Sequence, residues 1–258
     1  MTRIAFTQIL VLIGFAFVIL CCPPVSLAQV QMKVAYSAMT ANNAPFWVAK
    51  DKGLFKKNGL DIDLIYIEGG SRLVAAMLAG DTPIVHVGAT PIITAKLRGA
   101  DLVIIGATVN RLLFQFFVGK EIARPDDLKG KKVAISRFGS GSDLAMRMAL
   151  KELGLVPTKD VTILQLGGTP VRLAALDSRS IQGTVLLPPD TFIAMQRGFR
   201  PLIDLASSDL EFLNLGVSTS REFIRSKPDI VEKFMRSYVE AIHFYKTRES
   251  ESMEVLSK

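Results

Sequence analysis

The stretch KVAISRFGSGSDLAMRMALKELG, residues 132–154, decides the fold class. It begins with Lys132–Ile135, a largely apolar run of strand length, and a loop rich in glycine and serine follows. A helical stretch, Ser142–Leu153, then ends at Gly154, the residue type expected just past a helix C-terminus. A strand, a short loop and a helix in this order form one unit of an α/β protein.

The same alternation extends to both sides of this stretch. Further helices are predicted over Ala44–Asn58 and Ser71–Ala79, each followed by a glycine. The other runs of strand length are Met32–Tyr36, Ile62–Ile67, Ile84–Val87, Leu102–Ala107, Val161–Leu166 and Thr184–Leu187. This pattern predicts an α/β fold with mostly parallel sheets and helices on both faces.

The alternation starts twice, which predicts two lobes meeting at a cleft. One set of elements runs from Met32 to about Val109, and a second set starts near Lys131, after the polar segment Glu121–Gly130. A strand-like piece, Leu215–Ser218, follows later. A long helix is predicted over Pro228–Tyr245, where apolar residues recur every three or four positions and form a core-facing stripe.

The N-terminus has the layout of a secretory signal peptide, residues 1–28. Arg3 precedes the uncharged run Ile9–Leu20, and small residues precede a cleavage point before Gln29. A transmembrane anchor is the competing interpretation, but this run is too short to cross the hydrocarbon layer as a helix. Cys21 and Cys22 leave a lipoprotein as a further alternative, although Leu20 does not suit lipidation. We expect export to the periplasm.

Composition argues against several classes of function. Both cysteines lie in the leader, so the mature chain has no disulfide, catalytic thiolate or cysteine-ligated metal. The net charge of +7 is spread along the chain without a basic tract, so nucleic acid is not an expected partner. His86 lies in an apolar strand and is expected to be a hydrogen-bonded core or lobe-lining residue. Because no catalytic motif occurs, we expect no enzyme activity, cofactor or metal.

The candidate binding site is formed by loops that follow the strands, because open α/β sheets bind ligands at the carboxyl ends of their strands. The loop Ser136–Asp143 is the sharpest candidate. Its glycines allow close approach, Ser140 or Ser142 can cap the next helix, and a helix N-terminus favours an anion. An ordinary capped turn is the alternative. The predicted ligand-binding residues are Asn42, Phe46, Trp47, Ser71, Gly88, Ala89, Thr90, Asn110, Arg111, Ser136, Phe138, Gly139, Ser140, Gly141, Ser142, Asp143 and Pro189.

Several of these residues have two interpretations. Phe46 and Trp47 either form a wall for the ligand or belong to the core at a helix start. Arg111 and Arg137 either pair with a carboxylate or sulfonate or are ordinary surface groups.

Four segments together resemble the substrate-binding components of nitrate-, sulfonate- and taurine-type ABC importers, which are related to thiamine-precursor binding proteins. These segments are PFWVAKDKGLFKKNGLDIDL (45–64), SRLVAAMLAGDTPIVHVGA (71–89), DLKGKKVAISRFGSGSD (127–143) and LLPPD (186–190). The resemblance implies a two-lobed, type II periplasmic-binding-protein fold hinged by two crossing strands. It implies one lobe of residues 29–112 with a returning segment 206–258, and a second lobe of residues 113–205.

The same resemblance implies the function: a monomer that binds a small organic anion and delivers it to an ABC permease. The anionic head group is expected near Ser140–Asp143, and the organic tail near Phe46 and Trp47. Relatives are usually longer, so a truncated C-terminus is expected. A ligand-binding module of a sensor complex is an alternative. A thiamine-pyrimidine-synthesis-like enzyme is disfavoured, because the mature chain lacks cysteine. The identity of the ligand stays open.

Overall fold

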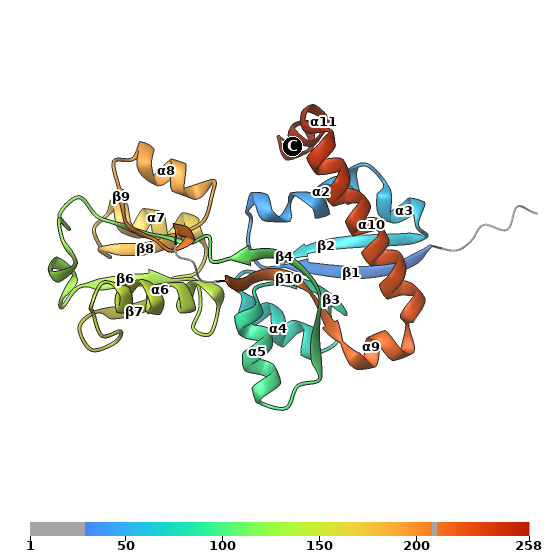
Figure 1. Cartoon of the computed structure of the whole chain (residues 1–258), viewed down its shortest axis with the longest axis horizontal. Helices are drawn as coiled ribbons and strands as arrows, with labels where there is room; N and C mark the ends of the chain where they lie inside the picture. Colours follow the sequence, from blue (N-terminus) through green and yellow to red (C-terminus); the bar gives the residue numbers. More distant parts are fainter. Residues whose placement is uncertain (1–28, 208–210, 258) are drawn as a thin grey trace, which may run out of the picture.

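The computed structural model describes residues 29–207 and 211–257, which form two five-stranded sheets, each with helices on both faces (Figure 1). We call each sheet with its helices a lobe. The sheet of the first lobe has the order β2-β1-β3-β10-β4. Its strands are β1 (Val30–Tyr36), β2 (Leu60–Tyr66), β3 (Ile84–Val87), β4 (Leu102–Arg111) and β10 (Glu211–Ser220). The predicted α/β class with mostly parallel sheets is confirmed.

The second lobe contains a sheet of order β7-β6-β8-β5-β9. Strand β6 runs parallel to β7 and β8, while β5 runs antiparallel to β8 and β9. The strands are β5 (Gln115–Val118), β6 (Lys132–Ile135), β7 (Thr162–Gln165), β8 (Gly183–Leu186) and β9 (Arg200–Asp204). The residue boundaries predicted for the lobes stay predictions.

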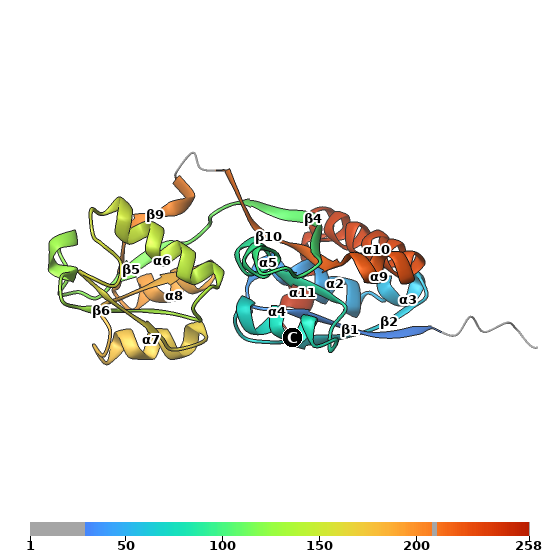
Figure 2. The same ribbon diagram turned by 90° about the horizontal axis from the view of Figure 1, so that it is seen from below.

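Two long strands carry the chain between the lobes. Strand β4 leaves the first lobe and β10 returns to it, and the two pair antiparallel from Leu102–Ser220 to Arg111–Glu211 with register shifts on the way. Figures 1 and 2 show both strands reaching toward the second lobe from the same side. Because β4 extends to Arg111, the predicted loop residues Asn110 and Arg111 belong to a strand, which corrects their expected position.

Helices cover both faces of each sheet. In the first lobe these are η1 (Ala41–Asn43), α2 (Ala44–Asp51), α3 (Leu54–Lys57), α4 (Gly70–Leu78), α5 (Ala89–Leu97), α9 (Arg221–Ser226), α10 (Pro228–Thr247) and α11 (Glu249–Leu256). In the second they are η2 (Pro125–Leu128), α6 (Gly141–Glu152), α7 (Thr169–Asp177), α8 (Asp190–Gln196) and η3 (Leu205–Ser207). The helix predicted over Ala44–Asn58 is instead two helices, because Gly53 takes the left-handed conformation (φ +67°) between them.

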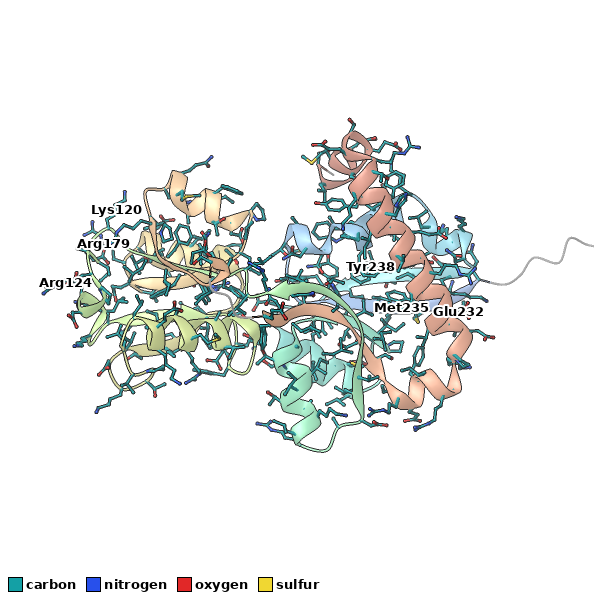
Figure 3. All side chains as sticks on the ribbon, viewed as in Figure 1. Lys120, Arg124, Arg179, Glu232, Met235 and Tyr238 are labelled. Carbon is teal, nitrogen blue, oxygen red and sulfur yellow. The ribbon has the colours of Figure 1, made fainter. Side chains whose placement is uncertain are left out.

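The core of the first lobe contains an aromatic cluster. Phe46 on α2 stacks on Tyr238 of α10 with ring centroids 4.4 Å apart, and Phe55 stacks on Phe234 at 5.6 Å. Figure 3 labels Tyr238 on α10, away from the second lobe. These rings are almost fully buried, so the predicted apolar stripe of this helix is confirmed as a core contact.

The predicted leader, residues 1–28, lies outside the described residues. Among the helices that the structure does describe, none combines the length and the apolar character needed to cross a membrane.

Candidate functional site

A cavity of about 390 Å³ lies between the two lobes. Its walls come from the segments that follow strands β1, β2 and β3 in the first lobe and β6, β7 and β8 in the second, with Asn214 and Leu215 of β10. These are the carboxyl ends of parallel strands, where ligands bind in open α/β sheets. The cavity therefore lies at the position expected from the order of the elements.

Six of the predicted binding residues line this cavity. They are Asn42, Gly88, Ser136, Ser140, Gly141 and Ser142. Four of the six come from the predicted segment Ser136–Asp143, which ends in the first turn of α6, so this segment contributes most of the predicted residues to the cavity.

The three serines of this loop form one hydrogen-bonded cluster. The Ser142 hydroxyl lies 2.8 Å from that of Ser136 and 2.9 Å from that of Ser140. Ser140 donates its own hydrogen to the Arg137 carbonyl at 2.7 Å, so it can only accept from Ser142. The hydroxyls thus form a chain in which each donates to the next, and a ligand oxygen can redirect the hydrogen of Ser136 toward itself.

The N-terminus of α6 keeps free donors toward the cavity. Ser140 occupies the N-cap position, but its side chain makes no cap hydrogen bond, which corrects the predicted serine cap. In the described part of the chain, no acceptor is found for the backbone N–H groups of Gly141 and Ser142. Unpaired N–H groups and the positive end of a helix dipole together favour an anionic oxygen.

Asp143, Phe138 and Gly139 do not line the cavity but shape the loop. The Asp143 carboxylate accepts from the Gly139 N–H at 2.8 Å and from Nε of Arg147 at 2.8 Å. The carbonyl of Phe138 accepts from the Ser71 hydroxyl across the cleft, at 2.8 Å. Ser71 therefore connects the two lobes and does not line the cavity, although it was predicted to bind the ligand.

Phe46 and Trp47 also lie outside the cavity wall. Phe46 is fully buried and packs against His86 and Tyr238. Trp47 meets the edge of Tyr36 with ring centroids 5.9 Å apart, and Tyr36 in turn lies 5.8 Å from Tyr66, which does line the cavity. Because α2 directs Phe46 into the core, residues 46 and 47 do not form the predicted aromatic wall. The aromatic side chain that lines the cavity near them is Tyr66.

The remaining predicted residues lie beside the cavity or away from it. Ala89 and Thr90 form the first turn of α5, behind Gly88. Asn110 and Arg111 are exposed on β4. Pro189 precedes α8 after a cis peptide bond, and its neighbour Asp190 reaches the cavity instead.

Arg172 is the main cavity residue that sequence reasoning missed. Its side chain is buried near the start of α7, and four hydrogen bonds hold it, to Gly167 O, Thr184 Oγ1, Val185 O and Thr169 Oγ1. A guanidinium has five N–H donors, so one on Nη2 is left over. One feature of the sequence could have pointed to Arg172. The Gly167-Gly168-Thr169-Pro170 turn after β7 repeats the strand, glycine and helix pattern of residues 132–154, which predicts a second site loop.

Arg172 is a buried cation without a directly contacting carboxylate. No ion pair in the described part of the chain includes it. Burial lowers its pKa to about 10, against a smaller opposing effect of Asp190 and Glu68, so it remains charged at neutral pH. The basic residues labelled in the second lobe of Figure 3, Lys120, Arg124 and Arg179, lie at its far end. A buried cation at a cavity, with no carboxylate in direct contact, favours an anionic ligand.

A second network supports the wall of the first lobe. Asn43 donates from Nδ2 to the Ala38 carbonyl, so its Oδ1 faces His86 Nδ1 at 2.6 Å and accepts the ring hydrogen. The other ring nitrogen lies 3.0 Å from the Thr108 hydroxyl on β4. Burial lowers the pKa of His86 to about 3, which keeps the ring neutral. The expectation of a hydrogen-bonded core histidine is confirmed, and it links the cavity residue Asn43 to a crossing strand.

Contacts across the cleft hold the lobes together beside the cavity. Arg137 donates from Nε to the Glu68 carbonyl at 3.3 Å, and its Nη2 lies 3.7 Å from the Glu68 carboxylate. Two glycines permit this approach: a Cβ at Gly69 would lie 2.8 Å from Arg137 Cδ, and one at Gly167 would lie 2.8 Å from Glu68 Oε1. Both have positive φ, where glycine is unstrained. Arg137 therefore contacts the opposite lobe and is not among the residues that line the cavity.

Comparisons with known proteins agree with this architecture. A family model described as NMT1/THI5 like matches residues 40–251. The taurine-binding periplasmic protein of Escherichia coli is 27% identical over 82% of this chain and 65% of its own length. The Bacillus subtilis binding protein YtlA is 31% identical over 52% of this chain and 42% of its own length. The chain thus spans less than two thirds of either relative.

Solved structures share the fold. The alkanesulfonate-binding protein SsuA from Xanthomonas axonopodis pv. citri, bound to MOPS, superimposes with a TM-score of 0.76 at 21% identity. The match covers 89% of this chain and 78% of that chain. The predicted periplasmic-binding-protein fold is confirmed by this likeness.

Proposed function

The chain belongs to the NMT1/THI5-like family, and on this basis we propose that it is the solute-binding component of an ABC importer, with a small organic anion as its ligand. The curated relatives named above are binding proteins, and the role proposed here requires no chemical step. The function consists of enclosing a solute and presenting it to a permease.

One observation carries the proposal: an interlobe cavity whose second-lobe wall combines a buried guanidinium with unpaired helix N–H groups. Arg172 is held by groups of its own lobe, so its position is set before a ligand arrives. An anion that contacts Arg172 and Ser136 on one side and Asn42 or Tyr66 on the other stabilises the closed arrangement of the lobes. Closure driven by contacts to both lobes is the usual hinge mechanism of two-lobed binding proteins.

The size and walls of the cavity indicate a small ligand. A volume of about 390 Å³ lies at the lower end of the range for small-molecule sites. Phe114, Val185 and Leu187 provide apolar surface next to the charged groups, which suits a short carbon skeleton rather than a bare inorganic anion.

The test is a binding screen of the purified chain against sulfonates, carboxylates, pyrimidines and inorganic anions. A ligand at 100 times its dissociation constant adds about 2.7 kcal/mol to the free energy of unfolding, which a thermal-shift assay detects. We expect stabilisation by organic sulfonates or carboxylates, followed by a titration in a calorimeter. Cooperative unfolding that no class of compound shifts would contradict the proposal.

The location and partners are parts of the same proposal. Residues 1–28 act as a cleaved signal peptide, the mature chain is a periplasmic monomer, and a permease of the inner membrane receives the solute. A relative named as periplasmic supports this location. The intact mass of the exported chain should correspond to a start at Gln29, and gel filtration should give a monomer. An uncleaved chain would contradict the proposed export route.

A further inference from the structure

Strand β4 contains a bulge beside the cavity. In β10, Leu215 pairs with Val109 of β4. The next residue, Gly216, pairs with Ala107, so Thr108 is left without a partner in β10. Bulges of this kind bend the strand and often redirect a side chain beside a functional site. Because Leu215 lines the cavity, the bulge lies where the crossing strands meet the cavity wall.

The side chain of the bulged residue bonds groups on two other strands. The Thr108 hydroxyl lies 3.0 Å from Nε2 of His86 on β3 and 3.0 Å from the Leu215 carbonyl on β10. His86 is completely buried, and its Nδ1 lies 2.6 Å from Oδ1 of Asn43, which is also a cavity residue. One imidazole ring thus connects two parts of the cavity wall, Asn43 directly and Leu215 through Thr108.

This network has an arrangement of hydrogens that satisfies its acceptors. The ring hydrogen of His86 lies on Nδ1, because the oxygen of Asn43 can only accept, so Nε2 needs a donor. The Leu215 carbonyl needs one too, and Thr108 has a single hydroxyl hydrogen for both. Tyr238, labelled on α10 in Figure 3, has its hydroxyl 3.4 Å from Nε2 and supplies the second donor. Thr108 then donates to Leu215, and both acceptors are satisfied.

We infer that His86 is a positioning residue: its ring, held between Asn43 and the bulged Thr108, fixes the crossing strands relative to the first-lobe wall of the cavity. A displacement of β4 would leave buried polar groups of the network without partners, which is costly. The strands and the wall therefore keep one relative position. The inference rests on the proposed function for its effect on affinity, whereas its effect on the lobes needs no ligand.

The first test measures the separation of the lobes. Both cysteines of the sequence lie in the proposed leader, so the exported chain has none. Lys96→Cys on α5 and Lys151→Cys on α6 therefore allow one spin label on each lobe. Pulsed electron resonance should give a broader distribution of label distances in Thr108→Val, which keeps the shape of the side chain and removes its hydroxyl. Thr108→Ser keeps the hydroxyl and should restore the narrow distribution.

Thr219→Val is the matched control for these measurements. Thr219 lies on β10 too, and its hydroxyl donates to the Pro83 carbonyl at 2.8 Å, but it does not line the cavity. Calorimetric titration with propane-1-sulfonate should give an affinity about three- to thirtyfold weaker in Thr108→Val and unchanged in Thr219→Val. A purely structural hydroxyl would lower the free energy of unfolding in both variants and the affinity in neither, which would overturn the inference.

A further measurement uses the unaltered chain, so a folding defect in a variant cannot obscure the result. Nitrogen NMR of the histidine-labelled chain should find the ring hydrogen of His86 on Nδ1. A hydrogen on Nε2, or one that exchanges between the nitrogens, overturns the inference. Equal label distances in Thr108→Val and the unaltered chain overturn it as well. Failure of propane-1-sulfonate to bind the unaltered chain counts against the proposed function alone, because the label distances are measured without ligand.

Discussion

The two walls of the cavity are built on different principles. The first-lobe wall includes backbone, Asn42, Asn43 and Tyr66, supported from behind by a neutral histidine, and also Glu68, whose carboxylate lies 3.7 Å from Nη2 of Arg137 in the other lobe. The second-lobe wall contains a buried cation, three serines and the start of α6. The buried cation thus belongs to the second-lobe wall, and the first-lobe wall is mostly neutral. If the proposed function holds, an anionic solute should depend more on the second-lobe wall than on the first.

Removing the positive charge of Arg172 from the second-lobe wall should have the largest effect on ligand affinity. Arg172→Met should weaken ligand binding by about 100-fold or more, because the loss of a buried, charge-assisted contact costs several kcal/mol. It also removes the guanidinium donors from Gly167 O and Val185 O, and a buried carbonyl left unsatisfied costs about 1–3 kcal/mol of stability. Titration calorimetry below the melting temperature measures the affinity. Arg197→Met, at an exposed arginine of the same lobe, is the control and should bind normally.

The neutral state of His86, behind the first-lobe wall, should make the free energy of unfolding depend on pH. His86 has a pKa of about 3 when folded and about 6.5 when unfolded, so below pH 6.5 protons bind preferentially to the unfolded chain. Its contribution to stability is present above pH 6.5 and is lost as the pH falls toward 3, by about 1.4 kcal/mol per unit. Urea unfolding of the chain and of His86→Gln at pH 7.5 and 5 checks this. The slope should shrink in the variant and persist in His243→Gln.

The contact between the walls should respond to a single added methyl group. Gly167→Ala places a Cβ 2.8 Å from the Glu68 carboxylate, which opposes closure of the cleft, while its positive φ costs about 1–2 kcal/mol in the open and closed states alike. We expect ligand affinity to fall about tenfold. Stopped-flow measurements should show that the dissociation rate rises more than the association rate falls. Unchanged kinetics would mean that Glu68 moves aside and that the cleft closes without this contact.

The smallest effect on ligand affinity is expected for Arg111, which belongs to neither wall of the cavity. Arg111 is exposed on β4 and does not line the cavity, so Arg111→Ala should change affinity by less than about twofold. A large loss on calorimetric titration would show that the crossing strand contacts the ligand and that the division into two walls is incomplete.

The sequence predicted most of the fold because the signals for strands and helix ends are local. Gly80 and Gly154 both have positive φ just past the helices they were expected to end, at φ +88° and +75°. The break at Gly53 was missed, although the same residue type causes it, because the apolar pattern continues on both sides. Strand β4 was predicted too short, because its last residues are polar and pair with a strand far along the chain.

The site was predicted in part, and the errors have a common physical cause. The serine loop was found because glycine, serine and a following helix are neighbours in sequence. Arg172 was missed because its burial depends on Thr184 and Val185 of the next strand. Phe46 was misplaced because its partner Tyr238 comes from the far end of the chain. Local pattern gives the elements, but the direction of a side chain depends on partners distant in sequence.

The order of the first sheet has a consequence for biosynthesis. Strand β10 lies between β3 and β4, yet it leaves the ribosome after all five strands of the second lobe. Until then β3 and β4 have no strand between them, and both present unpaired backbone edges. The second lobe can complete its sheet from one continuous piece of nascent chain, whereas the first lobe must wait. The late arrival of β10 thus makes the first lobe the part of the newborn protein most exposed to mispairing.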